Sequence, residues 1–518
     1  MTTASRAPRP WQRLERAFDA VFGAATNPLR HLGALGFLFF WWLAASGIYL
    51  FAVLDTSASA AYESIDRLSH LPWYAGGWLR SVHRYAADAF VIVMLLHLLR
   101  EWLLGRYKGF RRFSWLTGVP LLLFAFASGI VGFWLNWDRL GQYSAVATAE
   151  WLDAMPFFAS VLARNFLSVA SVNDRLFSLF IFIHVGVPLL LLFGLWFHIQ
   201  RISRAAVFPP RWLALMSTLG LLGLAVLAPV TSQAPADLAL VPGVLRFDWF
   251  LLFVHPLVDA SSATLVWAAL AAGVITLFGL PFLPQPAPAS VAEVDPINCN
   301  GCKRCFADCP YAAVTMVPHP DWQTPGRPIR QLAQVDADLC AGCGICVGAC
   351  PSSTPFRSGA RLLTGIDMPQ QPIDALRRQL DAGLVRLKAE HKFVVIGCDQ
   401  GPTVAALAGG DVLVLGLICT GQLPPSFIEY ALRQGAAGVL VTGCRDGDCA
   451  FRLGQRWTEE RLLGLREPHL RANVPRERLQ LVWPVASDPF ALARALDQLR
   501  DAARSLAPTV PETLADHG

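Results

Sequence analysis

The chain has 518 residues, of which 54% are hydrophobic and 16% are charged, and its formal net charge is +5. This composition is too apolar for one soluble globule, and the length allows several domains. The apolar residues lie mainly between residues 31 and 283, whereas charges and turn residues return after Asp295. The sequence therefore predicts a membrane half followed by a soluble half, with no sign of nucleic-acid binding.

Residues 1–30 combine arginines with apolar side chains at helical spacing, among them Trp11, Phe18 and Phe22. This pattern predicts a cytoplasmic amphipathic segment in contact with membrane lipid. The apolar run that follows is too long for the core of a signal peptide, so we expect an uncleaved span.

Six stretches are candidates to cross the ~30 Å hydrocarbon core of a bilayer. They lie at residues 32–54, 78–104, 114–136, 175–200, 211–230 and 261–283. The segments before the first span and after the second and fourth are rich in arginine, and the opposite loops are acidic. The bias of positive charge toward the inside predicts a multi-pass protein of the bacterial inner membrane with both termini in the cytoplasm.

Four histidines of the apolar half share one spacing. His83 and His97 are 14 residues apart on the second span, and His184 and His198 are 14 apart on the fourth. Fourteen residues make nearly four turns, so each pair shares one helix face with roughly 21 Å between its members. Two such antiparallel helices would hold two haem b groups, His83 with His184 near the outer surface and His97 with His198 near the cytoplasm. Isolated polar residues between helices are the alternative.

Glycines repeat this spacing on two other spans. Glycine permits a flat ring to approach the backbone, so these positions are predicted to face the haems. They are Gly33 and Gly47 on the first span and Gly118 and Gly132 on the third. Four arginines that flank the histidines are predicted to bind haem propionates: Arg80, Arg84, Arg100 and Arg201.

With Gly77–Arg80 before His83 and Pro188 after His184, residues 28–283 resemble the cytochrome b of quinol-oxidising complexes. The resemblance implies an all-α bundle with a four-helix dihaem core at 31–208. It also implies two further transmembrane helices at 209–283, joined by a loop that contributes to a quinone site.

That family carries a Pro-Glu-Trp-Tyr motif in its outer quinol site, where the glutamate accepts a proton. Here the corresponding segment reads Phe247-Asp248-Trp249-Phe250, which keeps a carboxylate but lacks the proline and the tyrosine. Asp248 is either the catalytic proton acceptor or an ordinary interfacial aspartate. His255 is either a second catalytic proton-handling group or an interfacial polar residue.

All twelve cysteines follow Asp295, in the part predicted to lie in a reducing compartment, which favours metal ligation over disulfides. After a proline-rich linker at 284–297, two Cys-x2-Cys-x2-Cys-x3-Cys-Pro runs match the bacterial ferredoxin pattern, in which the fourth cysteine of each run ligates the other cluster. Zinc would leave the third cysteine and the proline unexplained. We predict an α+β ferredoxin-like domain at 298–390 with two [4Fe–4S] clusters. Cluster one takes Cys299, Cys302, Cys305 and Cys350, and cluster two takes Cys340, Cys343, Cys346 and Cys309.

Residues 391–505 alternate between strand-like and helix-like stretches, which predicts a small α/β domain with a parallel sheet. The expected strands are 392–397, 412–418, 438–442 and 479–485. Four cysteines follow strand ends and would meet at the carboxyl edge of the sheet, where they suit one more iron–sulfur cluster. They are Cys398, Cys419, Cys444 and Cys449. Scattered buried cysteines are the alternative, and residues 506–518 are expected to form a tail.

Residues 391–490 also resemble the delta subunit of methyl-viologen-reducing hydrogenase through Cys419-Thr420-Gly421 and residues 443–449. The resemblance implies a [2Fe–2S] centre and electron exchange with a flavoprotein. An additional cysteine that this family usually has after the first is replaced here by Asp399-Gln400-Gly401.

Together these parts predict the membrane subunit of a quinone oxidoreductase complex, whose dehydrogenase site lies on a separate cytoplasmic, flavin-containing chain. The sequence has no Gly-x-Gly-x-x-Gly after a strand and no phosphate-binding loop. Electrons would pass from a cytoplasmic donor to quinone, or from quinol uphill to a low-potential cytoplasmic acceptor. A non-catalytic redox anchor is the other alternative, and a homodimer is compatible with the sequence.

Overall fold

The fold was analysed in a computed structural model, which describes residues 10–71, 76–155, 167, 172–241, 243–284, 290–320, 330–357, 359, 361–402, 404–444, 449–484, 488 and 490–505. The chain forms two compact units. We call residues 17–200 and 205–284 the membrane unit, and the described residues of 10–16, 201–204 and 290–505 the C-terminal unit. The predicted tail and linker residues 285–289 lie outside the described residues.

Five helical segments among the described residues are long and apolar enough to cross a membrane. They are Leu32–Val53, Leu79–Leu103, Gly109–Trp134, Asp174–Ile199 and Ala263–Phe282. These contain α2 (Leu32–Val53), α4 (Leu79–Leu103), α5 (Arg112–Trp134), α8 (Asp174–Ile199) and α11 (Ala263–Gly279). The predicted fifth span forms α9 (Arg211–Leu227), whose 17 residues reach only the lower limit for a crossing helix. Five of the six predicted spans therefore meet the criterion for a crossing.

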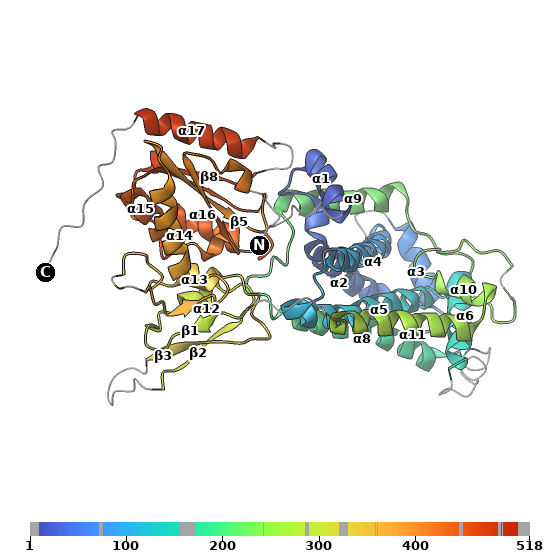
Figure 1. The fold of residues 1–518 in the computed structure, drawn as a ribbon. Coiled ribbons are helices and arrows are strands. Elements are labelled where there is room, and N and C mark those ends of the chain that lie inside the picture. Colours follow the sequence, from blue (N-terminus) through green and yellow to red (C-terminus); the bar gives the residue numbers. More distant parts are fainter. Residues whose placement is uncertain are drawn as a thin grey trace. The chain divides into compact units, whose positions relative to one another are not determined.

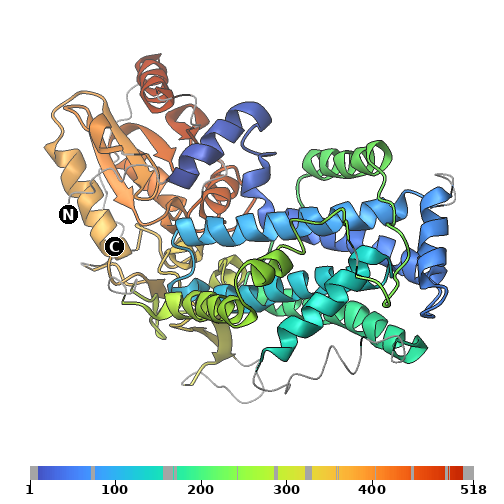
Figure 2. The ribbon, with the colours of Figure 1, turned by 90° about the vertical axis from the view of Figure 1, so that its right-hand side faces the viewer.

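The helices α2, α4, α5 and α8 form the centre of the membrane unit, with α2 packed on α4 and α5 packed on α8 (Figures 1 and 2). α9 packs beside α2 and α4, where Leu221 and Ala225 contact Val82 and Ala86. Trp42 Nε1 also donates a hydrogen bond of 3.2 Å to Thr218 Oγ1, which ties α9 to α2.

Short helices close the loops of the membrane unit. They are α3 (Ala61–His70), α6 (Arg139–Asp153) and α10 (Val254–Ala260), none of which was predicted. Asp138 caps the N-terminus of α6, because its Oδ1 accepts a hydrogen bond from Gly141 N at 2.9 Å. Its Oδ2 accepts a second hydrogen bond from Gln233 N, also at 2.9 Å. The loop before α10 is thereby attached to the end of α5. At the N-terminus, α1 (Pro10–Phe22) forms where an amphipathic helix was predicted.

The first part of the C-terminal unit contains two small antiparallel sheets. β1 (Glu293–Val294) pairs with β4 (Ile366–Asp367), and β2 (Val314–Pro318) pairs with β3 (Gln331–Val335). Two five-residue helices, α12 (Arg304–Asp308) and α13 (Ile345–Ala349), each lie within one cysteine run. This two-fold repetition agrees with the duplicated cysteine pattern.

The second part has one parallel sheet in the order β6-β5-β7-β8. The strands are β5 (Lys392–Cys398), β6 (Val412–Leu417), β7 (Ala436–Thr442) and β8 (Leu479–Val482). Successive residues of β5 face opposite sides: Phe393 and Val395 pack with α17 (Ala491–Ser505), and Val394 and Ile396 pack into the core on the other face. The remaining helices are α14 (Ile373–Arg386), α15 (Ser426–Arg433) and α16 (Gly454–Leu462) (Figure 1).

The predicted boundary at residues 390 and 391 does not separate two hydrophobic cores. One continuous cluster of buried residues runs from Ala292 to Val474 and includes Val347 near the cysteine runs and Ile396 of the sheet. α14 contributes to this shared core through Leu376 and Leu380. The iron–sulfur modules predicted from the sequence are therefore joined in one packed body.

Candidate metal centres

The four histidines lie as two opposed pairs in the membrane unit. The ring centres of His83 and His184 are 6.2 Å apart, and those of His97 and His198 are 6.5 Å apart. α4 supplies one member of each pair and α8 the other, in the same order along each helix. The two helices therefore run parallel, and the prediction of antiparallel histidine helices was wrong. A metal bound to two imidazoles sits about 2 Å from each nitrogen. Both separations are compatible with one iron between two rings.

Each predicted glycine faces one of these imidazoles. A Cβ atom built on Gly132 would lie 3.0 Å from His184 Cε1, and one on Gly118 would lie 3.1 Å from His198 Cε1. On α2, the corresponding distances are 3.2 Å from Gly47 to His83 and 3.5 Å from Gly33 to His97. Larger side chains would push the rings out of position, so the glycines hold open the space on which the pairing depends.

Hydrogen bonds orient three of the four imidazoles. Ser46 Oγ donates to Trp42 O and lies 3.0 Å from His83 Nδ1. Thr117 Oγ1 likewise donates to Phe113 O and lies 3.1 Å from His198 Nδ1. Because each hydroxyl proton is already used, each oxygen accepts from the histidine.

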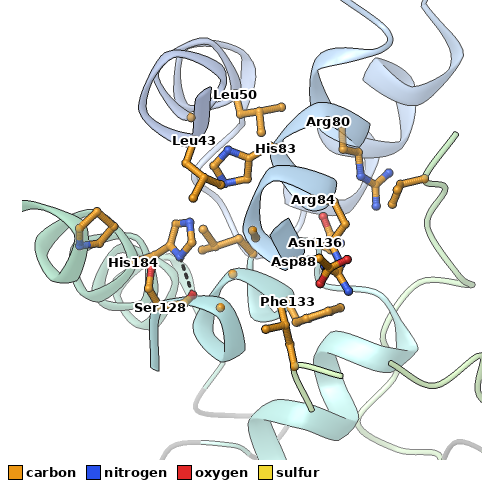
Figure 3. Close-up of a pocket in the computed structure, with 18 of the residues that line it drawn as sticks. Leu43, Leu50, Arg80, His83, Arg84, Asp88, Ser128, Phe133, Asn136 and His184 are labelled. Carbon is orange, nitrogen blue, oxygen red and sulfur yellow. Dashed lines mark hydrogen bonds and ion pairs between the residues drawn. The ribbon is translucent and has the colours of Figure 1, made fainter. Parts of the chain in front are cut away.

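For His184 the partner of Nδ1 is Ser128 O at 3.1 Å, and a carbonyl oxygen can only accept (Figure 3). The Nδ1 atoms of these three histidines therefore carry the proton, and the lone pair of each Nε2 is available. Metal-binding histidines use the same arrangement to fix the ring and its tautomer.

A cavity of about 740 Å³ lies at the His83–His184 pair, within the size range of cofactor and ligand pockets. Gly47 and Gly132 line it, and so do Asp88, Asn136 and Asp248. Figure 3 shows both imidazoles turned toward this space, with Arg80 and Arg84 at its side. The cavity thus joins the His83–His184 pair to the segment that contains Asp248.

The predicted propionate arginines differ in their partners. Arg80 is buried and donates from Nη1 to Ser69 Oγ at 2.5 Å and to Ser232 Oγ at 2.9 Å. Its buried Nη2 has no hydrogen-bond partner among the residues that the structure describes, which suits an anionic group in the cavity. Arg84 instead pairs with Asp88 and Asp248, and Arg100 pairs with Glu101 at 3.1 Å.

Asp248 lies at the cavity wall as an ion-paired carboxylate. Its Oδ2 contacts Arg84 Nη2, and its Oδ1 accepts from Phe250 N at 3.1 Å and Leu251 N at 2.7 Å. These donors favour the charged form. Arg84 therefore opposes protonation of Asp248, and a role of Asp248 as proton acceptor has to include this effect.

His255 does not line this cavity. It is buried beside α6, where its Nε2 lies 3.2 Å from Ser144 Oγ and its ring packs edge-on against Tyr143. Burial lowers the pKa of His255 to about 4, partly opposed by the charge of Asp259, so the imidazole is neutral at pH 7. The structure does not bring His255 together with Asp248.

In the C-terminal unit, the two cysteine runs exchange their fourth members. One small cavity is lined by Cys299, Cys302, Cys305 and Cys350. The other four thiols interact electrostatically, Cys309 with Cys340 and Cys343, and Cys346 with all three. Burial raises the pKa of Cys305 and Cys343 to about 12, because the thiolate is poorly solvated there. A bound cationic cluster would supply the charge that these buried thiolates lack.

The four later cysteines form a ring of sulfurs at the carboxyl end of the sheet. Cys398 and Cys449 each contact Cys419 and Cys444, and the Cys398 and Cys444 sulfurs are 3.9 Å apart. These contacts lower the pKa of Cys398 and Cys449 and raise the pKa of Cys419 and Cys444. In the described part of the chain, no three His, Cys, Asp or Glu side chains are spaced for a single metal ion. Thiolate sulfurs such as these four are the ligands that iron–sulfur clusters use.

Several residues of these sites were not predicted. Ser46 and Thr117 each immediately precede a predicted glycine, so a hydroxyl before glycine was a readable signal for two of the histidine partners. Asp88 had no such signal, since its role depends on a pairing with Arg84 that the fold brings to the cavity.

Three family comparisons agree with this arrangement. Residues 21–206 match Cytochrome b/b6/petB, residues 298–354 match the 4Fe-4S dicluster domain, and residues 408–507 match the delta subunit of methyl-viologen-reducing hydrogenase. The chain is a fusion of three redox modules. The three predicted resemblances are thereby confirmed. The cytochrome b match ends at residue 206, so the segment with Asp248 lies beyond it.

Among solved structures, the chain is similar to one titled "Hyperthermophilic respiratory Complex III". The identity is 19%, the match covers 49% of this chain and 75% of that chain, and the TM-score is 0.41. The family matches, with the apolar helices, make the fusion a multi-pass membrane electron-transfer subunit. They assign haem b to its helical region and [4Fe–4S] to its dicluster domain.

Substituting Gly132→Ala tests the contact between glycine and histidine. The new Cβ would meet His184 Cε1 at 3.0 Å, so we expect the haem content to fall from two groups per chain toward one. A pyridine-haemochrome assay of the purified protein measures this. Gly186→Ala is the matched control, because nothing lies within 4 Å of a Cβ at Gly186. Unchanged haem content in Gly132→Ala would contradict the role of the glycines.

The burial of His255 predicts a dependence of stability on pH. Its pKa in the folded protein is about 4, below its ordinary 6.5, so the unfolded chain binds the extra proton between these values. This contribution to stability is present above pH 6.5 and is lost as the pH falls toward 4, and it amounts to about 3 kcal/mol at most. In thermal unfolding of detergent-solubilised protein, His255→Gln should flatten the acid side of the profile.

Proposed function

We propose that this chain transfers electrons between the quinone pool and a cytoplasmic, flavin-containing partner through two b haems and three iron–sulfur clusters. The observation that carries this proposal is the shared cavity, because His83, His184 and Asp248 line one space. A quinone bound there would meet both a haem and a carboxylate. The predicted alternative of a non-catalytic anchor offers no reason for that arrangement.

His83 with His184 and His97 with His198 are proposed to bind the two haems, which supply reversible one-electron transfer within the membrane. In three of these histidines Nδ1 is hydrogen-bonded, which leaves the Nε2 lone pair available for a metal. Arg80 is proposed to bind a propionate through its unpaired Nη2. Arg84 is already paired with Asp88 and Asp248. We therefore assign Arg84 to the quinone site, whereas the sequence predicted that it contacts a propionate.

Asp248 is proposed to accept the proton that a quinol releases when it is oxidised. Its ion pair with Arg84 opposes protonation, but Arg84 also contacts Asp88. When Asp248 takes a proton, Arg84 keeps one carboxylate partner and its charge stays compensated within the cavity wall. Without Asp88, protonation of Asp248 would leave Arg84 as an unpaired buried charge, which is unfavourable. Asp88 therefore lowers the free-energy cost of protonating Asp248.

The two ferredoxin-type sites are proposed to hold one [4Fe–4S] cluster each. The sulfur ring of Cys398, Cys419, Cys444 and Cys449 is proposed to hold a third cluster, for which the hydrogenase-delta resemblance favours [2Fe–2S]. Of these, Cys398 lies before the matched residues 408–507, and its place in the ring supports its inclusion. The charge bias of the loops supports an inner-membrane location with both termini in the cytoplasm.

Replacing the carboxylate by Asp248→Asn tests the quinone site. We expect quinone-linked turnover to fall by about 100-fold or more, the usual effect of removing a general base. Haem content and reduction of the clusters by an artificial dye should persist. Asp237→Asn, an exposed position in the same loop, should retain turnover. Wild-type turnover in Asp248→Asn would remove the proposed site and favour quinone reaction elsewhere or the anchor alternative.

A further inference from the structure

Within the C-terminal unit, one buried arginine connects the loops of two different cysteine sites. Arg461 of α16 is 0% exposed, and its Nη2 forms a 2.5 Å ion pair with Asp308 Oδ2. Its Nη1 donates to Gly421 O at 2.9 Å, and Nη2 also donates to Ile345 O at 3.4 Å. Burial of a guanidinium costs free energy unless the groups around it compensate its charge.

The three partners of Arg461 belong to cysteine loops. Asp308 immediately precedes Cys309, and Ile345 lies between Cys343 and Cys346, so each is close in sequence to a ligand of cluster two. Gly421 follows Cys419, a member of the later sulfur ring, by two residues. Arg461 therefore bridges the loops of cluster two and of the C-terminal cluster. None of these three partners lines the cavity of cluster one.

The same two loops touch directly. A Cβ on Gly348 would lie 2.2 Å from Gly421 O, and a Cβ on Gly421 would lie 2.7 Å from the Ile345 side chain. Ile345, Cys419 and Trp457 form one buried cluster, with Cys343 packed against it. Cysteines assigned to two different clusters thus share one apolar contact region.

Electrostatics connect Arg461 to both sites. Burial lowers the pKa of Arg461, and the charge of Asp308, together with that of Cys419 when it is a thiolate, opposes that shift. Arg466 adds a second cation at 2.8 Å from Asp308 Oδ1, and its guanidinium lies 3.4 Å from the centre of the Trp457 ring. In a dry interior, one fixed charge acts more strongly than in water, and nearby charge is one of the factors that set cluster potentials.

We propose that Arg461 is a positioning residue that holds cluster two and the C-terminal cluster together and raises the reduction potentials of both. The proposal rests on the clusters of the proposed function and orders them: the C-terminal cluster exchanges electrons with cluster two, and cluster two exchanges electrons with cluster one. In each transfer one cluster is oxidised as the other is reduced by one electron, with no proton transferred and no bond made or broken.

The test is an EPR-monitored redox titration of the full-length protein. In Arg461→Gln, loss of the positive charge should shift the midpoint potentials of cluster two and the C-terminal cluster downward. The potentials of cluster one and the haems should stay at wild-type values. Arg461→Lys keeps the charge and should keep the potentials. Arg456→Gln, on the exposed side of the same helix and paired with Glu460, is the matched control and should shift nothing.

Asp308→Asn removes the negative charge beside Arg461, so it should move the midpoint potentials of the same two clusters upward. If Arg461→Gln does not accumulate as folded protein, Asp308→Asn is the variant that tests the proposal. Unshifted potentials in these variants, or equal shifts in all three clusters, would overturn the proposal. Absence of the cluster signals from wild-type protein would instead reject the proposed function, so the two failures are distinguishable.

Discussion

The membrane unit depends on one steric constraint, the close approach of four glycines to four imidazoles. Two parallel histidine helices can present opposed rings only if the flanking helices leave room for them. α2 and α5 do so at positions that repeat the histidine spacing, with built Cβ distances of 3.0–3.5 Å to the rings. Hydroxyl and carbonyl groups of the same two helices then fix the tautomer of His83, His184 and His198. The glycine helices thus provide both the space and the orientation.

In the C-terminal unit, the cysteines depend in a similar way on the groups around them. Buried thiols need a positive charge to ionise, and seven of the twelve cysteines are buried in a body whose main core is continuous. Because the core runs through the ferredoxin-like part and the parallel sheet, their sites have a fixed separation. Arg461 and Asp308 lie at that junction and link packing to electrostatics. In both units, then, the residues beside the ligands determine how the ligands are held.

The local repeats of the sequence were sufficient to predict much of this. The 14-residue spacing of His83 and His97, the duplicated cysteine runs and the short apolar strands are local signals, and the structure places each in the expected element. Long-range pairings were not predictable. Asp308 and Arg461 are 153 residues apart, and Arg84 and Asp248 are 164 apart, so only the fold brings them together.

The central claim is that electrons pass between the clusters and a quinone through both haems. It is tested most directly by reducing the clusters fully, adding a soluble quinone analogue, and following cluster and haem oxidation by rapid-mixing spectroscopy. The comparison is between wild-type protein and His198→Ala, which should lack only the inner haem. The account predicts rapid oxidation of the clusters in the wild type. In His198→Ala the outer haem should still be oxidised while the clusters stay reduced. Oxidation of the clusters at the wild-type rate without the inner haem would contradict the account.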